Sequence, residues 1–127
     1  MSKTNYLEDA VLNHFLRGVS AGGPYNPYVA LFTSAPGEAA GGTEVSGGSY
    51  ARRACGFSAP VSGAVTNAAD ITYPQATASW GTITHFAIFD ALSGGNMLYY
   101  GTLPVSKTVG TDDIFEFLAG TLSVTEL

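Results

Sequence analysis

The chain has 127 residues, of which 46 % are hydrophobic and 12 % are charged, and its formal net charge is −5. A chain of this length is expected to form a single domain over residues 1–127, large enough to fold without a metal or a disulfide. Its five basic residues argue against the clustered lysines and arginines that contact nucleic acid, and no run of about 18 apolar residues suggests membrane insertion. So little charge is typical of a chain that works inside an assembly.

The first predicted element is an α-helix over residues 5–17. Asn5 is expected to cap its N-terminus, with Glu8 reaching back to the cap, and Gly18 is expected to end it. Three apolar residues recur at helical spacing and are predicted to enter the core: Leu7, Val11 and Phe15. Glu8 and Asp9 interrupt this apolar stretch, so no signal peptide is expected and the chain is predicted to be made in a cytoplasm.

Strand signals follow the helix, in a β-domain expected over residues 25–127. Seven short segments are rich in β-branched and aromatic residues and bounded by turn formers: residues 28–33, 50–57, 69–74, 84–90, 97–103, 114–119 and 121–127. No second helix long enough for a parallel crossover is predicted, so the expected class is mainly β, an antiparallel β-sandwich or barrel-like domain with one N-terminal α-helix. Tight turns are expected at 64–70 and 106–113, with positive φ at Asn67 and Gly110.

The stretch TASWGTITHFAIFDALSGGNMLYYG, residues 77–101, contains the best-defined hairpin. Gly94, Gly95 and Asn96 lie between two apolar runs and can adopt the positive φ that a hairpin bend requires. Both faces of the first run are largely apolar, which is typical of a central strand between two layers. Four further residues are expected in the core: Leu31, Trp80, Phe86 and Ile88.

A glycine-rich segment of residues 35–49 separates the first two predicted strands. A loop of this length is either functional or without fixed structure, and a functional loop would be an arm that reaches a partner. In the next strand Arg52 and Arg53 point to opposite faces, so one of them is expected to meet an acidic group of a partner. Adjacent Tyr99 and Tyr100 likewise leave one ring for an interface. The candidate partner contacts are Glu44, Tyr50, Arg52, Arg53, Tyr99 and Tyr100.

No pattern in the sequence indicates a cofactor, a metal site or a catalytic site. Cys55, His14 and His85 lack metal-binding spacing, and Cys55 is expected to be a buried thiol. Asp90 lies five positions from His85, so in a regular strand the two side chains face opposite sides and do not form a catalytic pair. Spacing selects no carboxylate pair for glycoside hydrolysis among Glu38, Glu44, Asp90 and Glu116. A hydrolase acting on cell-surface glycan is therefore the least favoured function.

Three stretches and a β-rich C-terminal part together carry a resemblance that covers nearly the whole chain. The stretches are TNYLEDAVLNHFLRG, YVALFTSAPGEAAGGTEVSGGSYAR and TASWGTITHFAIFDALSGGNMLYYGTL. The combination resembles small structural proteins of tailed bacteriophages and prophages, which are often labelled tail fibre proteins. The resemblance implies no active-site motif that could be assigned to residues of this chain.

The resemblance implies a non-enzymatic virion component, either part of a tail fibre or otherwise associated with the tail. The implied partners are other virion proteins and copies of the chain itself, as a trimer by analogy, with a receptor on the host surface as a further partner. The alternative is a capsid decoration protein that clamps head subunits through the segment of residues 35–49 and the N-terminal helix. This alternative is serious because the chain has no repeat or heptad pattern of a long fibre.

Overall fold

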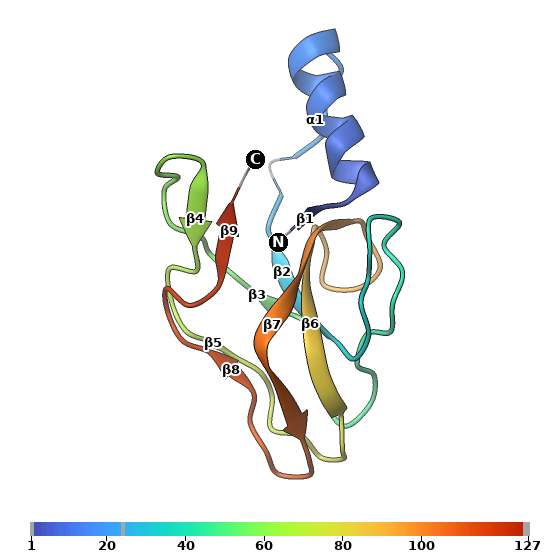
Figure 1. Cartoon of the computed structure of the whole chain (residues 1–127), viewed down its shortest axis with the longest axis vertical. Coiled ribbons are helices and arrows are strands. Elements are labelled where there is room, and N and C mark those ends of the chain that lie inside the picture. The colour runs from blue at the N-terminus through green and yellow to red at the C-terminus, as the bar shows by residue number, and fades with distance from the viewer. Residues whose placement is uncertain (1, 24, 126–127) are drawn as a thin grey trace.

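The computed structural model of the chain describes residues 2–23 and 25–125. In these residues one helix stands at one end of a body made of strands (Figure 1). The predicted class, mainly β and antiparallel with one N-terminal helix, is confirmed, and the strands form open sheets rather than a closed barrel. In chain order the elements are β1 (Ser2–Lys3), α1 (Asn5–Arg17), β2 (Tyr28–Phe32), β3 (Arg53–Ala54), β4 (Ala64–Thr66), β5 (Ile71–Thr72), β6 (Gly81–Phe89), β7 (Met97–Val109), β8 (Glu116–Phe117) and β9 (Ser123–Thr125).

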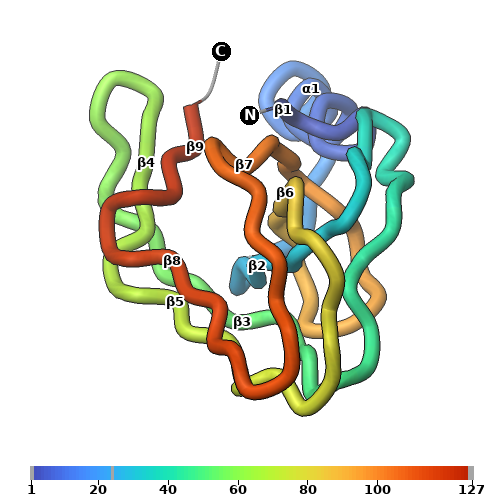
Figure 2. Tube along the Cα trace, turned by 60° about the horizontal axis from the view of Figure 1, so that its bottom comes forward, coloured from blue at the N-terminus to red at the C-terminus, as the bar shows by residue number. Residues whose placement is uncertain are grey.

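A five-stranded antiparallel sheet in the order β1-β7-β6-β2-β3 carries the fold. The hairpin of β6 and β7 forms its centre, and β2 pairs with β6 so that Leu31 lies opposite Phe86. Two short antiparallel ladders, β4 with β9 and β5 with β8, form separate sheets. Figure 2 shows these ladders on one side of the main sheet, where they make a second layer.

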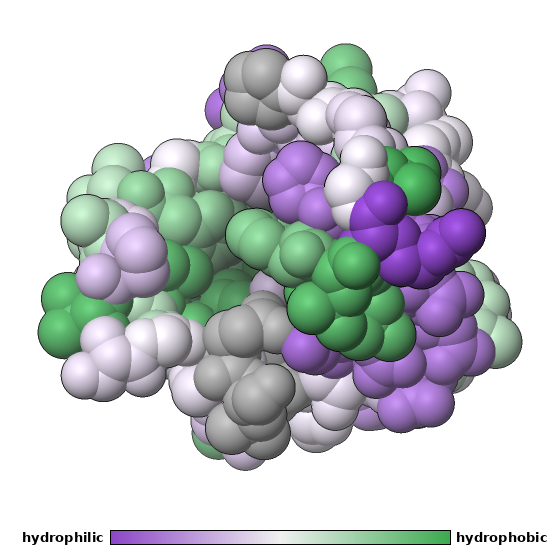
Figure 3. All heavy atoms as spheres, turned by 90° about the horizontal axis from the view of Figure 1, so that it is seen from above, coloured by the Kyte–Doolittle hydropathy of each residue, from purple (hydrophilic) through white to green (hydrophobic). Residues whose placement is uncertain are grey.

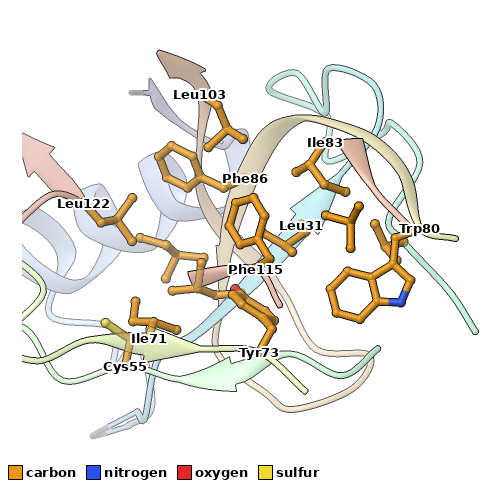
Figure 4. Close-up of a cluster of buried hydrophobic side chains, with 14 of the residues drawn as sticks. Leu31, Cys55, Ile71, Tyr73, Trp80, Ile83, Phe86, Leu103, Phe115 and Leu122 are labelled. Atoms are coloured by element: carbon orange, nitrogen blue, oxygen red, sulfur yellow. The ribbon is translucent and has the colours of Figure 1, made fainter. Parts of the chain in front are cut away.

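Two apolar clusters occupy the two faces of β6, because successive side chains of a strand point in opposite directions. The larger cluster fills the space between the main sheet and the ladders and includes Leu31, Trp80, Phe86 and Ile88 (Figure 4). These are the four strand-region residues that the sequence places in the core. The indole Nε1 of Trp80 donates to the carbonyl of Gly48 at 2.9 Å, which satisfies its one polar group. The smaller cluster contains Ala30, Phe32, Ala87, Phe89 and Met97.

The predicted strands all overlap observed ones, but several boundaries differ. Of the predicted strand at 50–57, only Arg53 and Ala54 form a strand, β3. β7 continues to Val109 and so includes the first part of the turn expected at 106–113. Residues 64–66 form β4 rather than a turn, because β9, about sixty residues later in the chain, supplies their hydrogen bonds. A sequence pattern over neighbouring residues does not show a partner strand so distant in the chain. The end of the predicted strand at 121–127 lies outside the described residues.

Asn67, Asn96 and Gly110 are expected to adopt positive φ, and none of the three does. Positive φ occurs at other positions, among them Ser62, Gly63 and Asp112. Gly94 and Gly95 do adopt positive φ in the hairpin bend, with φ of 61° and 70°. Asn67 is instead buried, and its side chain holds three backbone groups together. Its Nδ2 donates to the carbonyls of Ala69 and Leu118, and its Oδ1 accepts from the backbone nitrogen of Leu122.

The N-terminal cap of α1 is Thr4 and not Asn5 as the sequence analysis expects. Thr4 Oγ1 accepts from the backbone nitrogen of Leu7 at 3.3 Å, and its hydroxyl donates to the carbonyl of Met97 at 2.7 Å. The cap lies one residue earlier because β1 pairs with β7 and fixes the chain up to this point. Gly18 ends the helix with φ of 67°, as predicted.

Candidate interaction surface

No residue of α1 is buried. Leu7 and Val11 are half-buried and Phe15 is 75 % exposed, so the prediction that these three residues enter the core is wrong. Among the described strands, only β1 and β7 contact the helix. The helix extends past the end of the sheet (Figure 1), so no second layer covers its outer side.

Exposed apolar residues on the outer side of α1 and just past its end form a surface that we call the helix face: Leu12, Phe15 and Leu16 on the helix and Val19 after the cap residue Gly18. Their exposed fractions are 53 %, 75 %, 77 % and 46 %. Leu12, Phe15 and Leu16 follow the i, i+3, i+4 spacing with which a surface helix normally packs on a core. Figure 3 looks onto this end of the molecule, where hydrophobic residues gather beside strongly hydrophilic ones. Leu12, Leu16 and Val19 are not among the core or contact residues predicted from the sequence, although their spacing can be read from it.

The helix face is held in a fixed position by the start of the helix. The hydroxyl of Thr4 bonds to β7, and the backbone nitrogen of Asn5 donates to the carbonyl of Glu38 at 3.0 Å. A helix of thirteen residues is marginal in water on its own and normally gains its stability by packing its apolar side. The fold therefore presents an anchored helix whose apolar side has no cover within the described residues.

Three of the candidate partner contacts, Glu44, Tyr50 and Arg52, bind one another inside the chain. Arg52 is only 8 % exposed, and its Nε and Nη2 donate to the two carboxylate oxygens of Glu44, each at 2.9 Å. The hydroxyl of Tyr50 donates to Glu44 Oε2 at 2.7 Å and accepts from the backbone nitrogen of Leu31 at 3.0 Å. Burial, together with the bond to Glu44, raises the pKa of Tyr50 well above its usual value. The acidic group that Arg52 meets thus comes from the same chain, and a contact of these residues with a partner stays a prediction.

The segment of residues 35–49 does not form a free arm. Val45 is buried and its backbone nitrogen donates to the carbonyl of Leu31 at 3.0 Å, next to an isolated bridge between Phe32 and Glu44. The backbone nitrogen of Thr33 also donates to the carbonyl of Thr43. The segment is glycine-rich because it turns sharply and returns to β2, and its contact with a partner stays a prediction.

The remaining candidate contacts differ in their surroundings. Arg53 is exposed, whereas Tyr99 and Tyr100 are half-buried. Tyr99 packs against the larger cluster and Tyr100 against the smaller one, on opposite faces of β7. The rings of the two tyrosines therefore pack on the two cores and do not together form one exposed surface.

The carboxylates considered for chemistry bind different partners within the chain. Asp90 accepts from the backbone nitrogen of Asn96 at 2.7 Å and closes the hairpin bend. Glu116 accepts from the hydroxyl of Thr72, while Glu44 binds Arg52. In residues 2–23 and 25–125, no three histidine, cysteine or acidic residues lie close enough to hold a metal ion. No helix in that part of the chain is long and apolar enough to cross a membrane.

These features are those of a small antiparallel β unit that, in residues 2–23 and 25–125, has one helix, with an apolar face turned outward. The family model of the podophage GP4 fiber I protein gp80 matches residues 2–125. Because the match spans nearly the whole chain, the chain belongs to this family of phage fibre proteins. No curated protein matches the chain. The resemblance to phage tail fibre proteins is thereby confirmed, and membership of a phage fibre family implies a component of the virion.

Proposed function

We propose that the chain is a non-enzymatic structural unit of a phage tail fibre that associates with further copies of itself through the helix face. The observation that carries this proposal is the exposure of Leu12, Phe15 and Leu16 on an anchored helix, and of Val19 just past it, at one end of the molecule. Soluble monomers rarely keep such a contiguous apolar patch, and patches of this kind mark interaction sites. Membership of the fibre family supports the choice of a virion subunit as partner.

The expected gain from covering the helix face is large enough to drive association. Removing an exposed leucine or phenylalanine side chain from water is worth about 1.5–3 kcal/mol. Phe15 and Leu16 are the most exposed of the four and would contribute most. Only the surplus over the entropy lost on association appears as affinity. A second copy is the occupant we favour because virion parts act as symmetric oligomers, in which one patch serves every subunit.

Two other roles have less support from the positions of their residues. Capsid decoration relies on the segment of residues 35–49 and the N-terminal helix as bridging elements, and that segment is folded onto β2. Receptor binding relies on loop and tyrosine residues, and of these the rings of Tyr99 and Tyr100 pack on the cores of the chain. A glycan hydrolase would need two carboxylates that converge, whereas Asp90, Glu44 and Glu116 each have a separate partner.

The proposal is tested by the molar mass of the purified chain in solution, measured by light scattering. The wild type is expected to have the mass of a small whole number of chains, and three would agree with the trimer expected by analogy. A variant with Leu12→Gln, Phe15→Gln and Leu16→Gln is expected to be a monomer that keeps the circular dichroism of the folded chain, since none of these residues is buried within the chain, while its melting temperature falls because the stabilisation by association is lost. The control is Val61→Gln, because Val61 is 73 % exposed and lies away from α1 in sequence. A monomeric wild type, or a triple variant that keeps the wild-type mass, would refute self-association through this face.

The place of the chain in the particle is tested by its copy number. Quantitative mass spectrometry of purified virions compares the chain with the major capsid protein. A few to a few tens of copies are expected for a fibre protein. Hundreds of copies, in a simple ratio to the capsid protein, would overturn the tail assignment in favour of head decoration.

A further inference from the structure

A groove of about 560 Å³ separates β7 from β8. Its floor is formed by the buried side chains of Leu103, Val109 and Phe115, which belong to the larger core. Val105 and Ile114 line it as well and are 65 % and 60 % exposed. The groove is thus a part of the core that the second layer leaves open. We call it the β7–β8 groove.

The two strands beside the groove have free edges. β7 pairs with β6 on one edge, and on the other β1 covers only Tyr99 and Tyr100. β8 pairs with β5 alone, and in the described residues no ladder joins β7 to β8. The ladder between β6 and β7 is itself interrupted between Thr102 and Lys107. Unpaired backbone groups along an exposed edge are a template for another strand.

The dimensions of the groove suit an extended polypeptide. Between His85 and Ile83 of β6 the opposite strand β7 advances from Thr102 to Lys107, so residues 103–106 bulge out of that ladder beside the groove. A second hollow of about 300 Å³ continues from the first and shares Leu103, Pro104 and Phe117 with it. The apolar lining therefore extends past the end of the first hollow, toward Leu122.

The polar residues of the groove indicate which polypeptide would fit. Lys107 lies on the β7 wall, and Asp113 and Glu116 lie on the opposite wall. A basic side chain of the occupant would meet the acidic wall, whereas a phosphate backbone would be repelled by it. Pro104 has no backbone N–H and Lys107 is charged, and both are devices that protect an edge strand from unselective pairing. An occupant must therefore match the groove in side chains as well as in backbone.

We propose that the β7–β8 groove binds an extended segment of another fibre protein, which adds as a strand to the free edge of β7. Alternate apolar side chains of that segment pack on Leu103, Val105 and Ile114, and one basic side chain faces Asp113 and Glu116. In strand addition the backbone hydrogen bonds supply affinity and the alternate side chains supply specificity. The partner class rests on the proposed function as a fibre unit, but the groove and its edge are separate from the helix face.

The probes for this site are synthetic peptides of about ten residues that together cover the sequences of all structural proteins in the phage particle. Each peptide is titrated against the folded chain by fluorescence anisotropy. The expected result is saturable binding of peptides that alternate apolar residues and carry a lysine or arginine. If no peptide binds saturably, the proposal is overturned.

Variants of the groove locate the binding. Val105→Asp and Ile114→Asp are each expected to weaken the best peptide by about tenfold or more, because a carboxylate would replace an apolar contact. Both residues are exposed, so the melting temperature should remain close to that of the wild type. The matched control is Val61→Asp, at another exposed valine, which should leave binding unchanged. Equal binding by Val105→Asp and the wild type would contradict the proposal.

Methylation of the peptide backbone separates strand addition from simple apolar adsorption. N-methyl groups on the alternate amides that face β7 should abolish binding, whereas methyl groups on the other alternate amides should not. Equal effects of the two patterns would exclude strand pairing. The variant with three substitutions in the helix face should bind the peptide normally. Loss of self-association and loss of peptide binding can therefore be told apart.

Discussion

Arg52 and Glu44 form a bidentate ion pair that clamps the glycine-rich segment to the hairpin bend. The pair has two N···O distances of 2.9 Å, and the remaining nitrogen of Arg52, Nη1, donates to the carbonyls of Ala91 and Gly94 at 3.0 and 2.8 Å. The guanidinium also lies 3.6 Å from the ring centre of Phe89, as a cation–π contact. The side chain of Arg52 thus joins the glycine-rich segment, 8 residues away in sequence at Glu44, to the hairpin bend, 39 and 42 residues away at Ala91 and Gly94.

Arg52→Ala is expected to lower the free energy of unfolding by about 3 kcal/mol or more, because it removes one partner of a largely buried charge pair and frees two carbonyls. The effect should appear in urea denaturation as a lower midpoint with an unchanged slope. Arg53→Ala is the matched control, and it should change stability by no more than about 0.5 kcal/mol because Arg53 is exposed. Similar losses in the two variants would contradict the internal role assigned to Arg52.

Thr4→Ala is expected to lower the free energy of unfolding by about 1–2 kcal/mol, because one hydroxyl caps α1 and also bonds to Met97. Thr4→Ser keeps the hydroxyl and should lose much less. Thermal unfolding followed by circular dichroism gives both values. Asn5→Ala serves as a comparison at the position that the sequence favours as the cap. A larger loss for Asn5→Ala than for Thr4→Ala would show that the cap has been assigned wrongly.

Asn67→Ala is expected to destabilise the chain by about 1–3 kcal/mol, since it leaves the buried backbone nitrogen of Leu122 without its partner. Hydrogen exchange should show the loss locally, as faster exchange of the Leu122 amide. Asn96→Ala, at an exposed asparagine in the hairpin bend, is the control and should have a small effect. Unchanged exchange at Leu122 would count against this account of Asn67.

Stability should decrease as the pH rises from about 9 to about 11, in part because burial raises the pKa of the Cys55 thiol from 9.0 to about 11. In this range the unfolded thiol ionises while the folded thiol keeps its proton, so proton release favours the unfolded chain. Tyr50 and Tyr73 have raised pKa values for the same reason and act in the same direction. The difference between the wild type and Cys55→Ser isolates the part due to the thiol. If that difference were independent of pH between 8 and 11, the thiol would not be protected by the fold.

The local part of the fold could be predicted from the sequence. The helix over residues 5–17, its end at Gly18 and the hairpin bend at Gly94 and Gly95 depend on spacing and backbone conformation, which neighbouring residues decide. Trp80 and Phe86 could be placed in the core because removing their large apolar surface from water is favourable.

The candidate site could be predicted only in part. The sequence indicates that α1 has apolar residues at helical spacing, but it selects Leu7, Val11 and Phe15 as the buried side. The side of α1 that faces outward depends on how the helix is attached, because β1 and Thr4 bind the start of the helix to the end of β7. The residue types near Arg52 likewise indicate a charge pair, but not that its acid comes from the same chain.

The mainly β class, the helix over residues 5–17 and the membership of a phage fibre family follow from residue types and their order along the chain. The apolar residues that remain uncovered, at the helix face and in the β7–β8 groove, follow from the tertiary structure. Exposure depends on what the rest of the chain places against each residue. The pairing of β4 with β9 and of Arg52 with Glu44 joins segments whose separation in sequence hides their contact.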